Sequence, residues 1–190
     1  MKSSVLGVGY GVGVALILAA GSAARADGDV VGAIGFRSLS GDLWGSDFLD
    51  SDSQLALGVF ADFGLGELPL YIATGLQVSA DDGGEGGYSA AVVDLSVGLK
   101  LMATEGAVRP YVGAGVASVG ASIDTGFFSD DDDQSYGYYL GGGALFRIKR
   151  HFTLGIDLRY IGGTDIELLG VKDDADSVTA TALIGFSWGD

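Results

Sequence analysis

The stretch SVTATALIGFSW, residues 177–188, decides the fold of this chain. Its apolar side chains alternate with small or weakly polar ones, so Val178, Ile184, Phe186 and Trp188 share one face. Alternation with a period of two residues is typical of a β-strand. A soluble sheet usually shows a charged face opposite its apolar one, whereas here the opposite face carries no charge. A membrane barrel has this pattern, because one face of each strand meets lipid and the other lines the interior.

Seven further stretches repeat the alternation, and each is close to the length of about 9–11 residues that crosses a bilayer at a tilt. In one of them Val119 leaves the frame that Val112 and Val116 establish. We therefore predict an all-β fold, an eight-stranded antiparallel up-and-down transmembrane β-barrel. The seven stretches are 30–39, 54–63, 70–79, 91–101, 111–122, 136–148 and 152–161.

Charged residues inside these strands test which face points inward. All seven fall on the face opposite the apolar one, and a charge that faces lipid costs about 2–4 kcal/mol at the bilayer midplane. We therefore expect the seven to line the lumen, which in an eight-stranded barrel is narrow enough for side chains to fill. A structural salt-bridge network in a plugged barrel is the main interpretation, and a proton or ion path is the alternative. The seven residues are Arg37, Asp62, Asp94, Lys100, Arg147, Asp157 and Arg159.

The N-terminus has the pattern of an export signal. Lys2 precedes an uncharged apolar run from Val5 to Ala20, and Ala24-Arg25-Ala26 has the small-x-small form of a cleavage site. A transmembrane helix is the alternative, but the run is short and contains four glycines. We predict a signal peptide over residues 1–26 and an outer-membrane barrel domain over residues 27–190. The chain has no cysteine, so no disulfide can stabilise this domain.

The connections between the predicted strands differ in length and charge. Seventeen of the 25 acidic residues lie in the four longer connections, which hold a single basic residue, Lys172. Outer-membrane barrels have long outer loops and short periplasmic turns, so we place the acidic connections outside and Arg109, Lys149 and Arg150 at short turns. The net charge of −15 argues against nucleic acid as a partner. The longer connections are 40–53, 80–90, 123–135 and 162–176, and the shorter ones are 64–69, 102–110 and 149–151.

The four consecutive carboxylates Asp130, Asp131, Asp132 and Asp133 are the candidate metal ligands. Carboxylate oxygens suit Ca²⁺ or Mg²⁺, but the run lacks the spacing and turn glycine of an EF-hand loop. A solvated loop tip that attracts cations weakly is the alternative. We expect no other cofactor.

Other residues in the turns and loops offer less chemistry. His151 is the only histidine and is predicted at the periplasmic rim, where a solvated turn residue is the expected role and a catalytic base the alternative. A metal site of histidine and cysteine is excluded because these residues are too scarce. The exposed pairs Leu43-Trp44 and Phe127-Phe128 either anchor a partner or belong to the aromatic belt at the membrane interface.

Residues 27–190 resemble the outer-membrane β-barrel domain family, the small eight-stranded group that includes opacity-type surface proteins. The segments PYVGAG (110–115), LGGGA (140–144) and LGIDLRY (154–160) carry the resemblance, and the aromatic last strand is similar to the family's assembly signal. The resemblance implies a bacterial outer membrane, its assembly machinery, and lipid that includes lipopolysaccharide as partners. It implies no single activity.

We expect a non-enzymatic outer-membrane barrel with acidic surface loops that acts in envelope integrity or surface interaction. The first alternative is a narrow conduit for small or apolar solutes. The second is an enzyme that modifies outer-leaflet lipid, which would need a nucleophile and a base together at the outer rim. The extracellular partner is left open.

Overall fold

The computed structural model describes residues 27–40, 53–82, 89–124, 131–148, 151–168 and 171–189. Within these ranges, no helix is long and apolar enough to cross a membrane. The predicted signal peptide, residues 1–26, lies outside the described residues. The strands are β1 (Gly28–Leu39), β2 (Ser53–Gly64), β3 (Leu70–Asp82), β4 (Ser89–Met102), β5 (Val108–Asp124), β6 (Asp131–Arg147), β7 (Phe152–Gly162), β8 (Asp165–Leu168), β9 (Val171–Asp174) and β10 (Ser177–Trp188).

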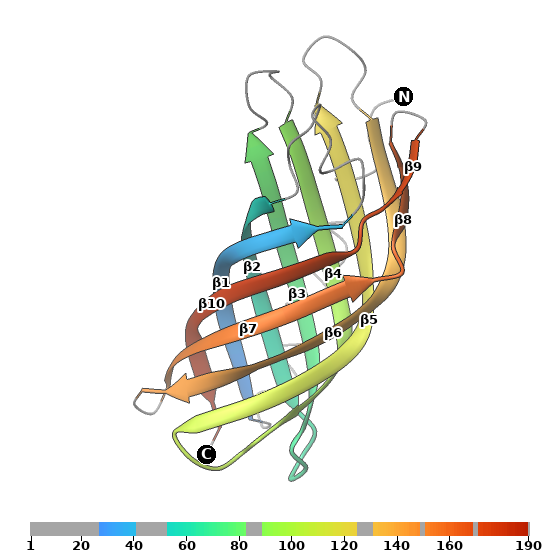
Figure 1. Cartoon of the computed structure of the whole chain (residues 1–190). Coiled ribbons are helices and arrows are strands. Elements are labelled where there is room, and N and C mark those ends of the chain that lie inside the picture. The colour runs from blue at the N-terminus through green and yellow to red at the C-terminus, as the bar shows by residue number, and fades with distance from the viewer. Residues whose placement is uncertain are drawn as a thin grey trace.

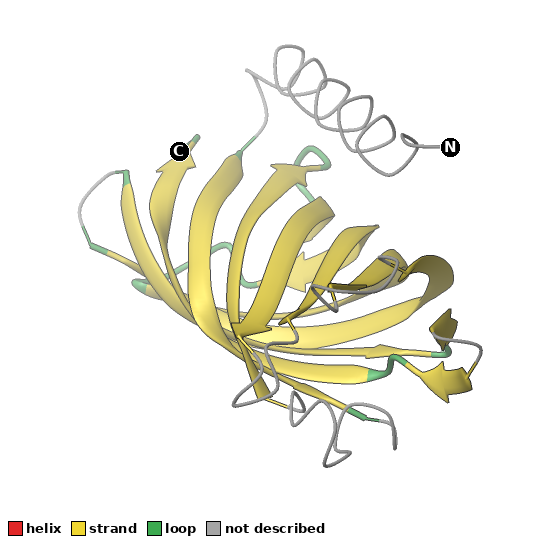
Figure 2. Cartoon of the chain, turned by 90° about the horizontal axis from the view of Figure 1, so that it is seen from above, coloured by secondary structure: helices red, strands yellow, loops and turns green. Residues whose placement is uncertain are grey.

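Eight of these strands close into one antiparallel barrel in the order β1-β10-β7-β6-β5-β4-β3-β2 (Figures 1 and 2). The first and last strands form the seam, with Gly28 opposite Trp188 and Leu39 opposite Ser177. Closure leaves no strand edge unpaired around the ring, which a bilayer requires because it offers no water to free backbone groups. The predicted eight-stranded up-and-down barrel is confirmed.

The remaining two strands, β8 and β9, pair into a separate hairpin between β7 and β10. The sequence prediction assigned this segment to a long loop and missed the hairpin. Each of its strands has only four residues, and charged residues occupy five of the eight positions, so the hydrophobic alternation has no room to develop. The hairpin projects at the end of the barrel where β3 and β5 end (Figure 1).

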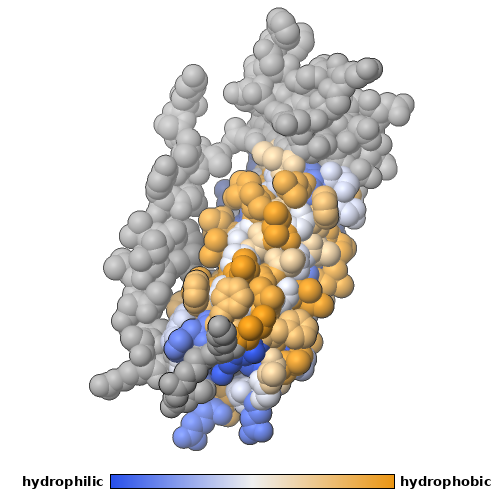
Figure 3. Space-filling view, turned by 90° about the vertical axis from the view of Figure 1, so that its left-hand side faces the viewer, coloured by the Kyte–Doolittle hydropathy of each residue, from blue (hydrophilic) through white to orange (hydrophobic). Residues whose placement is uncertain are grey.

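The outer wall of the barrel is apolar. Large side chains such as Phe36, Leu55, Val116, Ile184 and Phe186 are half or more exposed, and all of them point away from the lumen. In Figure 3 hydrophobic residues form a band on the wall, with hydrophilic residues below it. This face is the one that lipid covers.

Strand β5 shows where that band ends. Val112 and Val116 point outward, but further along the strand Ala117, Val119 and Ala121 are buried in the interior. Val119 therefore lies on the inner face, opposite to that of Val112 and Val116, as its departure from their frame in the sequence indicated. The apolar residues change face because β5 and β6, each 17 residues long, extend beyond the length needed to cross lipid.

Aromatic side chains mark both ends of the band. Phe63 packs against Trp188 with ring centroids 6.1 Å apart, and Phe152 packs against Phe186 at 6.3 Å, near the C-terminal end of the seam. Tyr138 and Tyr160, also 6.1 Å apart, lie toward the opposite end. Amphipathic rings collect at membrane interfaces, so these groups place the barrel in the bilayer.

Glycines on the inner face make room for large lumen side chains. A Cβ atom added at Gly98 would lie 2.6 Å from the Tyr139 hydroxyl, and one added at Gly115 would lie 2.6 Å from the Tyr139 ring. Neither position can hold a larger residue while Tyr139 stays where it is. The small residues of β4 and β5 thus allow a narrow barrel to contain an aromatic ring.

Candidate functional site

The buried charged side chains of the described protein gather in the lumen. The group in its outer half centres on Arg37 of β1. One guanidinium nitrogen, Nη2, makes an ion pair with the Asp94 carboxylate of β4 and donates to Gln77 Oε1 at 3.1 Å. The other, Nη1, donates to Ser79 Oγ at 3.1 Å. Because Arg37 is only 1% exposed, its charge depends on these partners rather than on water.

The middle of the lumen joins four strands through two acidic residues. Lys100 Nζ of β4 lies 2.5 Å from Asp62 Oδ2 of β2, and the Tyr111 hydroxyl of β5 donates to Asp157 Oδ2 of β7 at 2.6 Å. The Lys100 ammonium also lies 4.3 Å from the centroid of the Tyr111 ring. A cation over an aromatic face is attracted by the ring quadrupole, so the two acid contacts form one connected group.

Arg159 of β7 occupies the space between two aromatic rings. Its guanidinium carbon is 4.2 Å from the centroid of Phe60 and 4.8 Å from that of Tyr139. Its Nη1 donates to Ser96 Oγ at 2.9 Å, and its Nε lies 3.7 Å from Asp157 Oδ1. The stacked rings hold the guanidinium in one place and fill the cross-section around it.

A third polar group closes the lumen near the chain ends. Arg109 of β5 contacts both carboxylate oxygens of Asp29, at 2.6 and 3.3 Å, and donates to Ser187 Oγ at 3.1 Å. Ser187 in turn donates to Asp29 and shares a 2.5 Å hydrogen bond with Thr153 of β7. This seam cluster, Asp29, Arg109, Thr153 and Ser187, ties the first strand to the last from inside the barrel.

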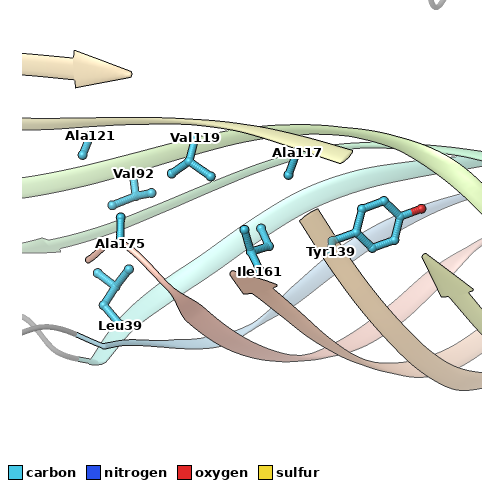
Figure 4. Packing of buried hydrophobic residues seen from close by; sticks show 8 residues of the cluster. All are labelled: Leu39, Val92, Ala117, Val119, Ala121, Tyr139, Ile161 and Ala175. Carbon is cyan, nitrogen blue, oxygen red and sulfur yellow. The ribbon is translucent and has the colours of Figure 1, made fainter. Parts of the chain in front are cut away.

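Apolar side chains gather at the opposite end of the lumen (Figure 4). They are contributed by β1, β4, β5, β6 and β7 and by Ala175, which lies between β9 and β10, and each is at most 5% exposed. Buried serines lie among them, because Ser177 is the register partner of Leu39 and Ile161, and Ser79 is that of Val92, so apolar and polar side chains together fill this end. The apolar side chains are Leu39, Val92, Ala117, Val119, Ala121, Tyr139, Ile161 and Ala175.

The structure brings together six of the seven charged residues that the sequence assigned to the lumen. They lie in three pairs, Arg37 with Asp94, Lys100 with Asp62, and Arg159 with Asp157, and all six are buried. Arg147 is the exception, because it is the last residue of β6 and is only partly buried. No ion pair joins it to the other six within the described part of the chain.

Sequence reasoning missed the seam cluster. Arg109 was predicted at a short turn, which is wrong, because β5 begins at Val108 and the Arg109 side chain is 2% exposed. Asp29 was left out because the predicted strand began at Val30, the first apolar residue. The alternation contained this information. Asp29 is an even number of positions from Arg37, and Arg109 an even number from Val119, so the members of each pair lie on the same face of their strand. Extending the alternation past the last apolar residue would have found both.

The predicted metal ligands fall at the edge of the described chain. Asp130 lies outside the described residues, and Asp131, Asp132 and Asp133 belong to β6, opposite Ile123 to Ala121 of β5. The expectation that these three lie at a loop tip is therefore wrong, because both strands extend further than the sequence indicated. Across the described ranges, no group of three or more acidic or histidine side chains is arranged to hold a metal ion. The pairs Leu43-Trp44 and Phe127-Phe128 also lie outside the described residues.

His151 lies at the turn between β6 and β7. It is exposed, its Nδ1 lies 3.2 Å from the Ser187 carbonyl oxygen, and its own carbonyl accepts a hydrogen bond from the Ser187 amide. The Ser187 hydroxyl is turned toward Asp29 and Thr153 in the lumen instead. These contacts attach the turn to the last strand.

Comparison with known proteins agrees with this architecture. The family model of the outer membrane protein beta-barrel domain matches residues 10–188. This chain belongs to that family. The protein therefore lies in the bacterial outer membrane, where its apolar wall contacts lipid. A search of the curated proteins finds no match.

Solved structures of small outer-membrane barrels have the same fold. Ail, the attachment invasion locus protein of Yersinia pestis, is 11% identical with a TM-score of 0.61, and the match covers 86% of this chain and 99% of Ail. Neisserial surface protein A is 17% identical with a TM-score of 0.59, covering 85% and 96%. The N-terminal barrel domain of Pseudomonas aeruginosa OprF is 14% identical with a TM-score of 0.53, covering 86% and 98%. At these identities the likeness establishes the fold alone.

Proposed function

We propose that this family member is a non-enzymatic outer-membrane protein that acts at the cell surface, in envelope integrity or in surface interaction. The observation that carries the proposal is the filled lumen. Apart from Arg147, its described charges are paired with one another, and buried apolar side chains gather at the outer end. Lumen side chains that are paired with one another stabilise the barrel and offer little to a partner. The side chains that can bind a partner are therefore those of the outer surface.

The charge of that surface supports a role for cations. The longer connections and the strand ends that flank them hold most of the acidic residues, and the net charge is −15. Divalent cations gather where carboxylates crowd together, and they also bridge anionic lipid headgroups. We infer that Ca²⁺ or Mg²⁺ links the acidic outer segments to the phosphates of lipopolysaccharide.

A polyanionic partner fits this protein poorly. Ail has been solved in complex with the heparin analogue sucrose octasulfate. The chain described here carries 25 acidic and 10 basic residues, and four of the basic ones, Arg37, Lys100, Arg109 and Arg159, are buried in the lumen. Like charges repel across an interface, so we do not carry that ligand over. A cationic or cation-bridged partner fits the balance of charge better.

A conduit for small or apolar solutes is the weaker candidate. It requires a continuous path past the stacked Arg159, and the side chains around that residue are buried and in contact. Planar bilayers that contain the purified protein measure this directly. Steady single-channel conductance from the wild-type barrel would favour the conduit over the surface role.

A deletion strain tests the surface role. We expect it to admit more hydrophobic dye, or to adhere differently, than its parent strain, and to differ most when divalent cations are scarce. Complementation with the wild-type gene should restore the parental behaviour. A gene with Asp130 through Asp133 changed to Asn should restore it only in part. Identical permeability and adhesion of parent and deletion strains at every cation concentration would contradict the proposal.

A further inference from the structure

The lipid-facing wall has a hollow of about 380 Å³ that crosses β6, β7 and β10. Its floor is made by Gly142 of β6 and by Ala180 and Ala182 of β10, which lie on the two sides of Ile156 and Leu158 of the middle strand β7. The register places Gly142 and Ala180 on opposite sides of Leu158, so two small residues flank one large one. Backbone that large side chains cover elsewhere is accessible here from the bilayer.

A polar aromatic cluster lies directly above the hollow. Tyr160 is the next outward residue of β7 after Leu158, about 7 Å further along the strand. Its ring packs against Tyr138, and its hydroxyl donates to Asp176 Oδ2 at 2.8 Å. Asp176 also accepts hydrogen bonds from the amide and the hydroxyl of Thr164. The carboxylate therefore fixes the position of Tyr160 at the polar boundary.

The outward-facing tyrosines of the described residues all lie at this place. Tyr136 on β6 is 74% exposed and receives a 3.5 Å contact from Gln134 Nε2, and Tyr138 follows it on the same face. The remaining described tyrosines, Tyr71, Tyr111 and Tyr139, point into the lumen. Among the described residues, phenolic hydroxyl groups, which donate and accept hydrogen bonds, thus stand over one part of the apolar wall only.

We propose that the hollow binds one acyl chain of a lipid A molecule whose sugar and phosphate groups contact the tyrosine cluster. The hollow is continuous with the lipid-covered wall, so the occupant is hydrocarbon. The tyrosines lie at the outer end of the barrel, so the chain comes from the outer leaflet. The small floor residues bring more of the chain into van der Waals contact than a ridged wall does. The inference rests on the proposed function only in its choice of an outer-leaflet glycolipid.

Native mass spectrometry of the refolded protein in detergent with added lipid A tests the proposal. We expect one lipid A to be retained per barrel. Ala180→Phe and Ala182→Phe each fill the hollow from the lipid side. Either should reduce the retained fraction about tenfold, as expected when roughly two methylene groups lose contact. Val97→Phe on β4 is the matched control, because it adds the same ring to an outward position away from the hollow, and it should bind as the wild type does.

Three further arms make the result decisive. Tyr160→Phe keeps the ring and removes the hydroxyl, so it should weaken retention while Val97→Phe does not. Phosphatidylethanolamine retained as well as lipid A would overturn the assignment to a glycolipid. Retention unchanged in both filling variants would overturn the hollow as the site. A protein dimer that the filling variants dissociate would assign the hollow to a second copy of this chain. A heat-dependent gel shift confirms that each variant is folded, and none of these readouts depends on the phenotype of a deletion strain.

Discussion

Arg109 on β5 and Asp29 on β1 make a two-pronged ion pair across the lumen, directly beneath the seam where Asp29 pairs with Ser187 of the last strand. The two residues lie 80 positions apart in the chain. Their contact therefore links the seam between β1 and β10 to the opposite wall of the barrel.

Replacing Arg109 with Leu should lower the free energy of unfolding by about 3–5 kcal/mol, because the Asp29 charge stays buried without its cation. Urea titration in lipid vesicles measures this loss. Glu105→Gln, at an exposed turn position, is the control and should change stability by about 0.5 kcal/mol or less. The double variant Arg109→Leu, Asp29→Asn should lose less than the two single losses added together. Strict additivity would mean that the two side chains are not coupled.

Replacing Arg159 with Leu should destabilise the barrel far more than replacing its neighbour Leu158 with Ala. Arg159 is 5% exposed among rings and hydroxyls, whereas Leu158 is 57% exposed to lipid. The first change leaves buried carboxylates with one cation fewer, and the second removes a side chain that lipid can replace. The same titration ranks the two variants. If Leu158→Ala proves the more costly change, the assignment of inner and outer faces is wrong.

The folded protein should resist unfolding by SDS until it is heated. All strand edges in the ring are paired, so no free backbone groups offer a place for unfolding to begin. Samples refolded in detergent should migrate differently on a gel before and after boiling. Identical migration would show that the sheet does not close under those conditions.

Calcium should protect the outer connections from protease more than sodium chloride does at equal ionic strength. Both salts screen repulsion between carboxylates, with a Debye length of about 10 Å at 0.1 M, but only Ca²⁺ is coordinated by carboxylate oxygens. Changing Asp130 through Asp133 to Asn should reduce the extra protection. Cleavage rates measured in the two salts compare the mechanisms, and equal protection would leave general screening as the only effect of the acidic residues.

The inside-outside frame of the barrel could be predicted because it depends on local alternation alone. The face on which a residue such as Leu158 or Arg159 lies can be predicted from the polarity of its neighbours two positions away. Strand ends were less accurate, since β5 continues past Val116 with small residues outside and apolar ones inside. The partners in the lumen could not be predicted, because Arg37 on β1 meets Asp94 on β4 only after the sheet has closed. Pairing inside a closed ring depends on its circumference, which no single strand encodes.

The register of the seam has a consequence for how the polypeptide reaches its final state. Every strand pair except one joins segments that follow each other closely in the sequence. Residues 28–39, in contrast, can complete their pairing only after residues 177–188 have arrived. Loop closure over such a separation is slow compared with hairpin formation. An incompletely exported chain that lacks residues 177–188 can hold the ladders from β1 to β7 and still present two bare edges, on β1 and β7, which are sites for aggregation. Secretion that stalls before the final dozen residues should therefore yield an open sheet that is prone to aggregate. Protection of its two unpaired edges by a chaperone matters most at this stage of export.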